Sequence, residues 1–200
     1  MLNVLSLFTG YDGMGLGLQL AGIEYKTVGY CDNDKFIQDL LRQRIKDGLL
    51  QDAPIIDNIY TDWSPYFGLV GLLTGGFPCQ PNSIANSNRQ GEFDPRNCWP
   101  ATRECIVQVR PQYVILENVT GILSGIDGRP PYAGNVIADL VSIGYDTLWD
   151  CVSASDAGAP HRRLRWWCFA WLPSNLADSD SERLRGWLDK KRGVKERLIQ

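Results

Sequence analysis

The chain has 200 residues, of which 44% are hydrophobic and 22% are charged, and its formal net charge is -3. These values fit one globular domain with a full core, and they exclude a disordered tail, a collagen-like repeat and a coiled coil. No apolar run approaches the roughly 20 residues of a membrane span, and no signal peptide opens the chain, so we expect a cytoplasmic protein without membrane contact. The six cysteines are scattered and there is one histidine, which predicts neither a disulfide framework nor a metal site.

Apolar, β-branched-rich runs alternate along the chain with segments of helical spacing. Strands are predicted at residues 3–8, 25–31, 55–60, 69–74, 113–116, 145–152 and 165–172, and helices at 14–21, 35–45, 100–109 and 135–143. This alternation predicts an α/β fold with a mostly parallel, twisted sheet covered by helices on both faces. Ligands of such sheets bind beyond the carboxyl ends of the strands, so the residues that follow each strand are the candidate site.

The loop after the first predicted strand is rich in glycine. Its spacing, Gly10-x-x-Gly13-x-Gly15, differs from the Gly-x-Gly-x-x-Gly of dinucleotide sites and disfavours an oxidoreductase. Asp32 follows the second predicted strand, where an acid can accept from ribose hydroxyls, and Asn58 follows the third, where an amide can meet an adenine edge. Together they favour an adenosine ligand without a diphosphate, for which S-adenosylmethionine is the candidate. The alternative is an ordinary turn between a strand and a helix.

Three further positions carry candidate chemistry, each with a plainer alternative. Cys79 lies in a Gly- and Pro-rich loop after the fourth predicted strand. Its side chain is either an activated thiolate or a small buried hydrophobic group. Glu117 directly follows the fifth predicted strand. It is either a partly buried acid with a raised pKa or an ordinary solvated acid in a loop. Arg163 and Arg165 share one side of an extended segment and suit phosphate or base-edge contacts, or form a solvated charge cluster.

These blocks, in this order, resemble the DNA cytosine-5 methyltransferase family over roughly residues 2–172. Phe8-Thr9-Gly10…Gly13 looks like its cofactor loop, Pro78-Cys79-Gln80 like its nucleophile motif, Glu117-Asn118-Val119 like its Glu-Asn-Val motif, and His161-Arg162-Arg163-Leu164-Arg165 like its Gln-x-Arg-x-Arg. The resemblance implies a Rossmann-like methyltransferase domain over residues 1–172, with 173–200 as a charged helix or tail. It also implies a bacterial or phage-infected cell as the setting.

The resemblance assigns roles residue by residue. Catalytic roles fall on Cys79, Glu117, Arg163 and Arg165. S-adenosylmethionine, with S-adenosylhomocysteine as its product, is expected at Phe8, Thr9, Gly10, Gly13, Asp32, Asn33, Asn58, Ile59 and Pro78, and the substrate at Gln80, Ser83, Asn118 and Val119. The substrate is a cytosine flipped out of duplex DNA, methylated at carbon 5 through a covalent Cys79 adduct.

The sequence also departs from the family pattern. Asp12 stands where the family commonly has Gly, which we expect to place negative charge near the cofactor. We find no target-recognition domain and no final cofactor motif, so we expect weak sequence-specific activity from this chain alone. Two alternatives stay open: a non-catalytic or split-enzyme subunit that needs a second polypeptide for target recognition, and a methyltransferase acting on cytosine in RNA.

Overall fold

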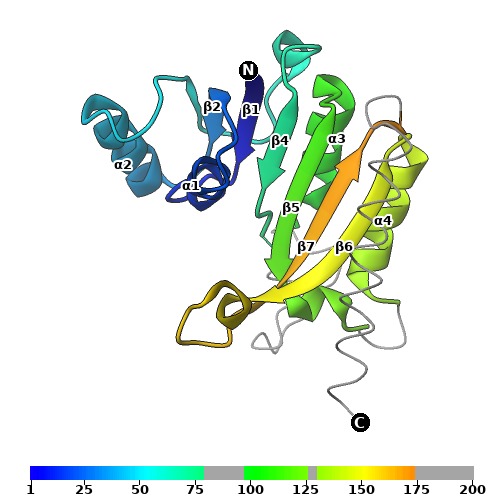
Figure 1. Cartoon of the computed structure of the whole chain (residues 1–200). Coiled ribbons are helices and arrows are strands. Elements are labelled where there is room, and N and C mark those ends of the chain that lie inside the picture. The colour runs from blue at the N-terminus through cyan, green and yellow to red at the C-terminus, as the bar shows by residue number, and fades with distance from the viewer. Residues whose placement is uncertain (79–96, 126–129, 174–200) are drawn as a thin grey trace.

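The computed structural model describes residues 1–78, 97–125 and 130–173. One seven-stranded sheet runs through this part of the chain in the order β3-β2-β1-β4-β5-β7-β6 (Figure 1). Its strands are β1 (Leu2–Leu7), β2 (Tyr25–Cys31), β3 (Ile55–Ile56), β4 (Leu72–Gly75), β5 (Tyr113–Val119), β6 (Asp146–Ser153) and β7 (Leu164–Trp171). The pairings among β1 to β5 are all parallel, and β7 lies antiparallel between β5 and β6. The prediction of a mostly parallel sheet is therefore confirmed.

In the described residues, four α-helices accompany the strands: α1 (Gly13–Leu20), α2 (Lys35–Lys46), α3 (Trp99–Val109) and α4 (Tyr132–Ser142). Each overlaps a helix predicted from apolar spacing. Local sequence fixes their ends: Asp34 caps α2 by accepting from the Phe36 and Ile37 amides, and Arg110 ends α3 in a left-handed conformation. No described helix is long and apolar enough to cross a bilayer.

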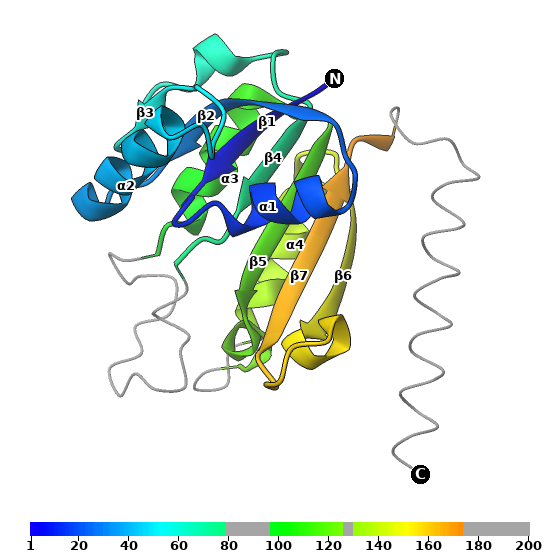
Figure 2. The same cartoon turned by 60° about the vertical axis from the view of Figure 1, so that its left-hand side comes forward.

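The helices cover the two faces of the sheet unequally. Helices α3 and α4 lie behind the sheet and α1 in front of it (Figure 2). The large core cluster joins strand residues such as Leu5 and Leu116 to Ile106 of α3 and Val136 of α4. The cluster on the α1 face contains only three buried residues, Val4, Leu18 and Leu72. The rigid, well-packed side of the sheet is thus the one that faces α3 and α4.

Among the strand boundaries that differ from the prediction, those of β5 and β3 affect the site. Strand β5 continues to Val119 rather than ending at 116, because β7 pairs with it through Val119–Arg165 after its pairing with β4 has ended at Leu116. Glu117 therefore lies within a strand and not after it. Strand β3 is only two residues long, since the Asn58 side chain accepts from the Tyr60 amide and turns the chain.

Candidate active site

The loop of residues 8–13, called the cofactor loop below, joins β1 to α1 and is held by side chains at the strand ends. The Thr9 hydroxyl donates to the Ser6 carbonyl at 3.0 Å, and the Thr9 amide donates to the Cys31 carbonyl at 3.0 Å. The Gly10 amide donates to Asp32 Oδ2 at 2.9 Å. Asp32, at the end of β2, therefore fixes the backbone of the cofactor loop through one of its carboxylate oxygens.

The cofactor loop needs unusual backbone angles. Phe8, Gly10 and Asp12 all have positive φ angles, of 52°, 54° and 58°. Glycine adopts this left-handed region freely, while aspartate is one of the few other residues that tolerate it. The three left-handed residues turn the chain sharply, so that α1 starts beside the end of β1.

Glu117 and Arg165 form an ion pair at the carboxyl edge of the sheet. Arg165 Nε lies 2.9 Å from Glu117 Oε1, and both side chains are about three-quarters buried. Burial raises the pKa of Glu117 above its ordinary value, while the charges of Arg165 and Arg163 act to lower it. The pairing follows from the sheet register, because β5 and β7 are antiparallel and Glu117 lies opposite Trp167, two residues from Arg165.

The segment after β4 is anchored beside Glu117. The buried Asn118 side chain donates from Nδ2 to the Phe77 carbonyl at 2.9 Å. A Cβ atom on Gly76 would lie 3.2 Å from Glu117 Oε2, so glycine there leaves room for the carboxyl group. Pro78, the last described residue of this segment, leads directly into Cys79.

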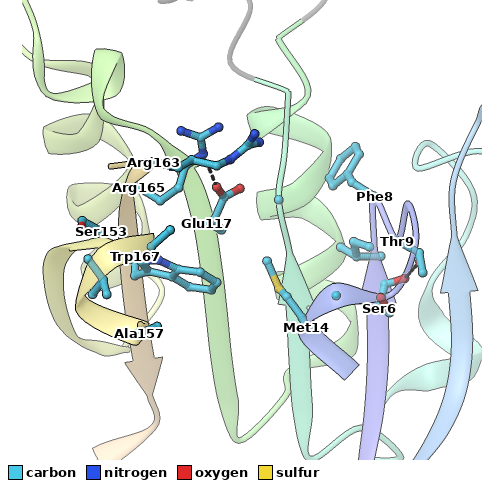
Figure 3. Close-up of a pocket in the computed structure, with 15 residues that line it drawn as sticks. Ser6, Phe8, Thr9, Met14, Glu117, Ser153, Ala157, Arg163, Arg165 and Trp167 are labelled. Carbon is cyan, nitrogen blue, oxygen red and sulfur yellow. Dashed lines mark hydrogen bonds and ion pairs between the residues drawn. The ribbon is translucent and has the colours of Figure 1, made fainter. Parts of the chain in front are cut away.

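A cavity of about 480 Å³ lies between the cofactor loop and the ends of β5, β6 and β7. Glu117, Arg163 and Arg165 stand on one side of it, and Phe8 and Met14 face them from the other (Figure 3). Its carboxyl and guanidinium groups are surrounded by apolar atoms, which strengthens their electrostatic interactions. The cavity can therefore hold a flat polar group against an acid whose pKa is raised by burial.

The structure brings six of the predicted site residues to this cavity: Phe8, Thr9, Gly13, Glu117, Arg163 and Arg165. Four others, Asp32, Asn33, Asn58 and Ile59, lie next to the ends of β2 and β3, with Asn33 and Asn58 exposed and Ile59 buried. Gly10 contacts Asp32, while Asn118 and Val119 are parts of β5 that do not line the cavity. Cys79, Gln80 and Ser83 lie outside the described residues.

Sequence reasoning missed the wall of the cavity opposite the cofactor loop. This wall consists of Val152 and Ser153 at the end of β6, Ala154 and Ala157 in the 3-10 helix η5 (Ala154–Ala157), and Trp167 of β7. Trp167 could have been found from sequence, because it is two residues beyond Arg165 and must share its face of the strand. No pattern in the sequence indicates that the residues of η5 line the cavity.

Comparisons with known proteins identify the family. The family model of the C-5 cytosine-specific DNA methylases matches residues 2–195, and the chain belongs to this family. Curated relatives include the Type II methyltransferases M.NaeI of Lentzea aerocolonigenes, 30% identical over 82% of this chain and 38% of the relative, and M.PspPI of a Psychrobacter species, 33% identical over 73% and 33%. M.Bsp6I of a Bacillus species is 32% identical over 82% of this chain and 50% of the relative.

Solved structures support the fold. DNMT2 of Spodoptera frugiperda, solved as a mutant, matches with a TM-score of 0.67 and 21% identity over 89% of this chain and 54% of that one. The S. pombe Dnmt2 methyltransferase matches with a TM-score of 0.66 and 24% identity over 86% and 49%. The chain spans about a third to a half of the length of the curated relatives named above.

Proposed function

We propose that this chain carries the catalytic machinery of an S-adenosylmethionine-dependent methyltransferase that acts on carbon 5 of cytosine in DNA. The observation that carries the proposal is the Glu117–Arg165 pair, 2.9 Å between Oε1 and Nε, in a cavity shared with the cofactor loop. Membership of the cytosine-5 methylase family supports the same reaction.

The residues beside the cofactor loop fit S-adenosylmethionine. Left-handed backbone at Phe8 and Gly10 brings the loop close to a ligand, and the glycine spacing leaves no pyrophosphate cradle. Asp32 and Asn58 would hold the ribose and the adenine edge, and Pro78 would border the sulfonium. Phe8, Thr9 and Gly13 would line the rest of the site, with Asn33 and Ile59 beside the adenosine. When bound, the cofactor supplies an electrophilic methyl group.

Cys79 and Glu117 would act on the cytosine together. The Cys79 thiolate forms a bond to carbon 6 while Glu117 donates a proton to ring nitrogen 3, which makes carbon 5 nucleophilic. After carbon 5 has gained the methyl group, it loses its proton to a water molecule, the bond from carbon 6 to sulfur breaks and releases the Cys79 thiolate, and nitrogen 3 returns its proton to Glu117. Burial raises the pKa of Glu117 above its ordinary value, which favours the protonated form that this step requires.

The arginines and the flanking segment would hold the substrate. Arg165 orients Glu117 through their ion pair, and Arg163, which lines the same cavity, would contact the base carbonyl or the neighbouring phosphate. Asn118 would act by holding Phe77 in place, and Val119 by pairing with Arg165. Gln80 and Ser83 follow the nucleophile in sequence and would contact the flipped nucleotide.

Residues 1–172 would form the catalytic domain, with the charged segment 173–200 following it. Because DNA-binding interfaces of defined specificity bury on the order of 1,000 Å² or more of protein surface, we propose that a second polypeptide assists target recognition.

A methyl-transfer assay tests the proposal. The chain, alone and with the products of neighbouring reading frames, is incubated with duplex DNA and S-adenosylmethionine labelled in its methyl group. The expected result is label at carbon 5 of cytosine, lost in Cys79→Ala. Label on single-stranded RNA alone would support the RNA alternative, and cofactor binding without transfer under every condition would support a non-catalytic subunit. Either result would contradict the proposal.

A further inference from the structure

Asp12 lies in the cofactor loop, but it does not line the cavity of the proposed active site. Its neighbours Gly13 and Met14 line the active-site cavity and Asp12 does not. The Asp12 side chain instead lines a second cavity, of about 750 Å³, between α1 and the turn after α2. Asp12 is only 5% exposed. The carboxyl group therefore lies behind the cofactor loop, within the framework that supports it.

The first turn of α1 is shaped around this carboxyl group. A Cβ atom on Gly15 would lie 2.2 Å from Asp12 Oδ2 and 2.7 Å from its Cγ, which no side chain could tolerate. Gly15 thus leaves the space that the carboxyl group occupies. The Gly15 amide and the Ser6 side chain both lower the pKa of Asp12, against the effect of burial, which places the carboxyl group between the end of β1 and the start of α1.

Contacts from α2 and β2 hold the same region from behind. Arg44 Nη1 donates to the Tyr11 carbonyl at 3.1 Å, and its guanidinium lies 5.6 Å from the centre of the Tyr11 ring. The Tyr25 hydroxyl donates to the Gly15 carbonyl at 2.9 Å. These bonds hold the residues on either side of Asp12. Its own backbone is bonded as well, because its amide donates to the Thr9 carbonyl at 2.9 Å and its carbonyl accepts from the Leu16 amide at 3.0 Å.

We propose that Asp12 is a positioning residue for the cofactor loop: its buried carboxyl group braces the end of β1 against the first turn of α1 and so fixes Gly13 and Met14 in the active-site cavity. The inference rests on the proposed function, in which this loop binds S-adenosylmethionine. Asp12 itself does not contact the cofactor.

The brace is sensitive to pH. Burial raises the pKa of Asp12 to about 6, against the effects of Gly15, Ser6 and Arg44. The other groups that face Asp12 are Arg44 of α2 and Tyr25 and Tyr30 of β2; burial raises the pKa of both tyrosines, so these groups keep their charge state between pH 5 and 7.5. Glu24 lines the same second cavity.

The sign of the pH effect follows from the raised pKa. In the braced state the Asp12 carboxyl group is buried between β1 and α1, and its pKa is raised. Protonated Asp12 therefore favours the braced state, and this stabilisation is lost as the pH rises through about 6. A carboxyl group that moves from an ordinary pKa to about 6 on bracing changes the braced population by about fourfold at most between pH 5.5 and 7.5. Cofactor affinity should therefore be higher at pH 5.5.

Calorimetry with S-adenosylhomocysteine tests the inference on the full-length chain at pH 5.5 and 7.5. Asp12→Asn keeps the shape of the protonated acid, so its affinity should match the wild-type value at pH 5.5 and be the same at both pH values. Asp12→Ala removes the brace and should bind about tenfold more weakly at both. Asp62→Ala is the control: this aspartate accepts from the Ser64 amide at 3.0 Å, lines neither cavity, and its loss should leave affinity unchanged.

Two results would overturn the inference: wild-type affinity in Asp12→Ala, even with a lower melting temperature, or a pH dependence that persists in Asp12→Asn. If the wild-type chain binds no S-adenosylhomocysteine, the proposed function is contradicted, because it requires this cofactor site. Hydrogen exchange of the free protein then tests the role of Asp12 independently. The amides of residues 9–16 should exchange at least tenfold faster in Asp12→Ala than in wild type. Equal exchange in the two proteins would overturn it.

Discussion

Glu117 lies in an environment that acts on its pKa in two opposite directions. Burial is the larger effect and raises the pKa, and the neighbouring charges of Arg165 and Arg163 oppose it. The arginines therefore hold the carboxyl group in place while burial favours its protonated form. A protonated acid can donate a proton to a ring nitrogen and take it back at the end of the reaction.

Glu117→Gln should separate chemistry from binding. The amide cannot give up a proton, so methyl transfer should fall at least 100-fold, the range of a lost general acid. Affinity for S-adenosylhomocysteine should stay within twofold, since Glu117 is not among the proposed cofactor ligands. Single-turnover transfer and calorimetry measure the two quantities. A variant that kept more than a tenth of the wild-type rate would remove Glu117 from the mechanism.

Asp12→Asn should stabilise the protein at alkaline pH. The folded pKa of about 6 lies above the ordinary 3.8, so the stabilising effect of the protonated acid is lost as the pH rises through about 6. The ionised group then lowers stability by an amount on the order of 2–3 kcal/mol. The variant should melt about 5 °C higher than wild type at pH 8, with the gap closing near pH 4.5. A gap of the same size at both pH values would refute this account of the titration.

At the scale of elements, the antiparallel strand β7 builds the site. It extends the ladder of β5 past the end of β4, so Glu117 is held within a strand, and it delivers Arg165 to the same edge. Residues from distant parts of the sequence thereby meet in a rigid frame. This rigidity is what an active site needs to fix an acid relative to a nucleophile.

Gly76→Ala should disturb this frame locally. The new Cβ atom would lie 3.2 Å from Glu117 Oε2 and 3.8 Å from the Met14 terminal methyl group, so the carboxyl group must move by a few tenths of an ångström. Transfer should fall about tenfold with little change in melting temperature. The control is Gly134→Ala in α4, where nothing lies within 4 Å of the added atom; it should raise stability by up to about 1 kcal/mol and leave transfer unchanged. Full activity in Gly76→Ala would contradict the close packing of Glu117.

Much of the fold could be predicted from the sequence, because alternating strands and helices leave local patterns. Each predicted strand and helix overlaps an observed one. The end of β5 could not be predicted, because it is set by pairing with β7, almost 50 residues away. The shortness of β3 could have been anticipated from Asn58, a residue that often turns the chain.

Part of the candidate site could likewise be predicted from the sequence, and part of it could not. Motif order singled out Glu117, Arg163 and Arg165, and the fold places all three at one cavity. The η5 wall and the direction of the Asp12 side chain depend on tertiary packing, which no local pattern records. The sequence predicts the Asp12 charge near the cofactor, and in the fold Asp12 lines a second cavity and not the one that contains Glu117.

For the whole molecule, the question is whether residues 1–172 fold as a unit. The large core cluster draws on residues from Leu5 to Ala170, and the Leu172 amide donates to the Gln112 carbonyl at 3.1 Å. These contacts are all made within the proposed catalytic domain.

A chain that ends at Pro173 should therefore keep its fold. Circular dichroism should show one cooperative melting transition within about 5 °C of the full chain, because the buried core is retained. Calorimetry with S-adenosylhomocysteine should give the same affinity for both proteins. A truncated chain that melts without cooperativity would show that the segment 174–200 belongs to the domain.

The central claim is that Cys79 bonds to cytosine beside Glu117, and trapping tests it most directly. Duplex DNA with every cytosine replaced by 5-fluorocytosine is incubated with the chain, any partner polypeptide it requires and S-adenosylmethionine, because fluorine at carbon 5 cannot leave as a proton. The account predicts a complex that survives denaturing electrophoresis, with the nucleotide on Cys79 by mass spectrometry, and no complex with Cys79→Ala. A complex that forms equally in Cys79→Ala, or its absence from a wild-type chain that binds cofactor and DNA, would contradict it.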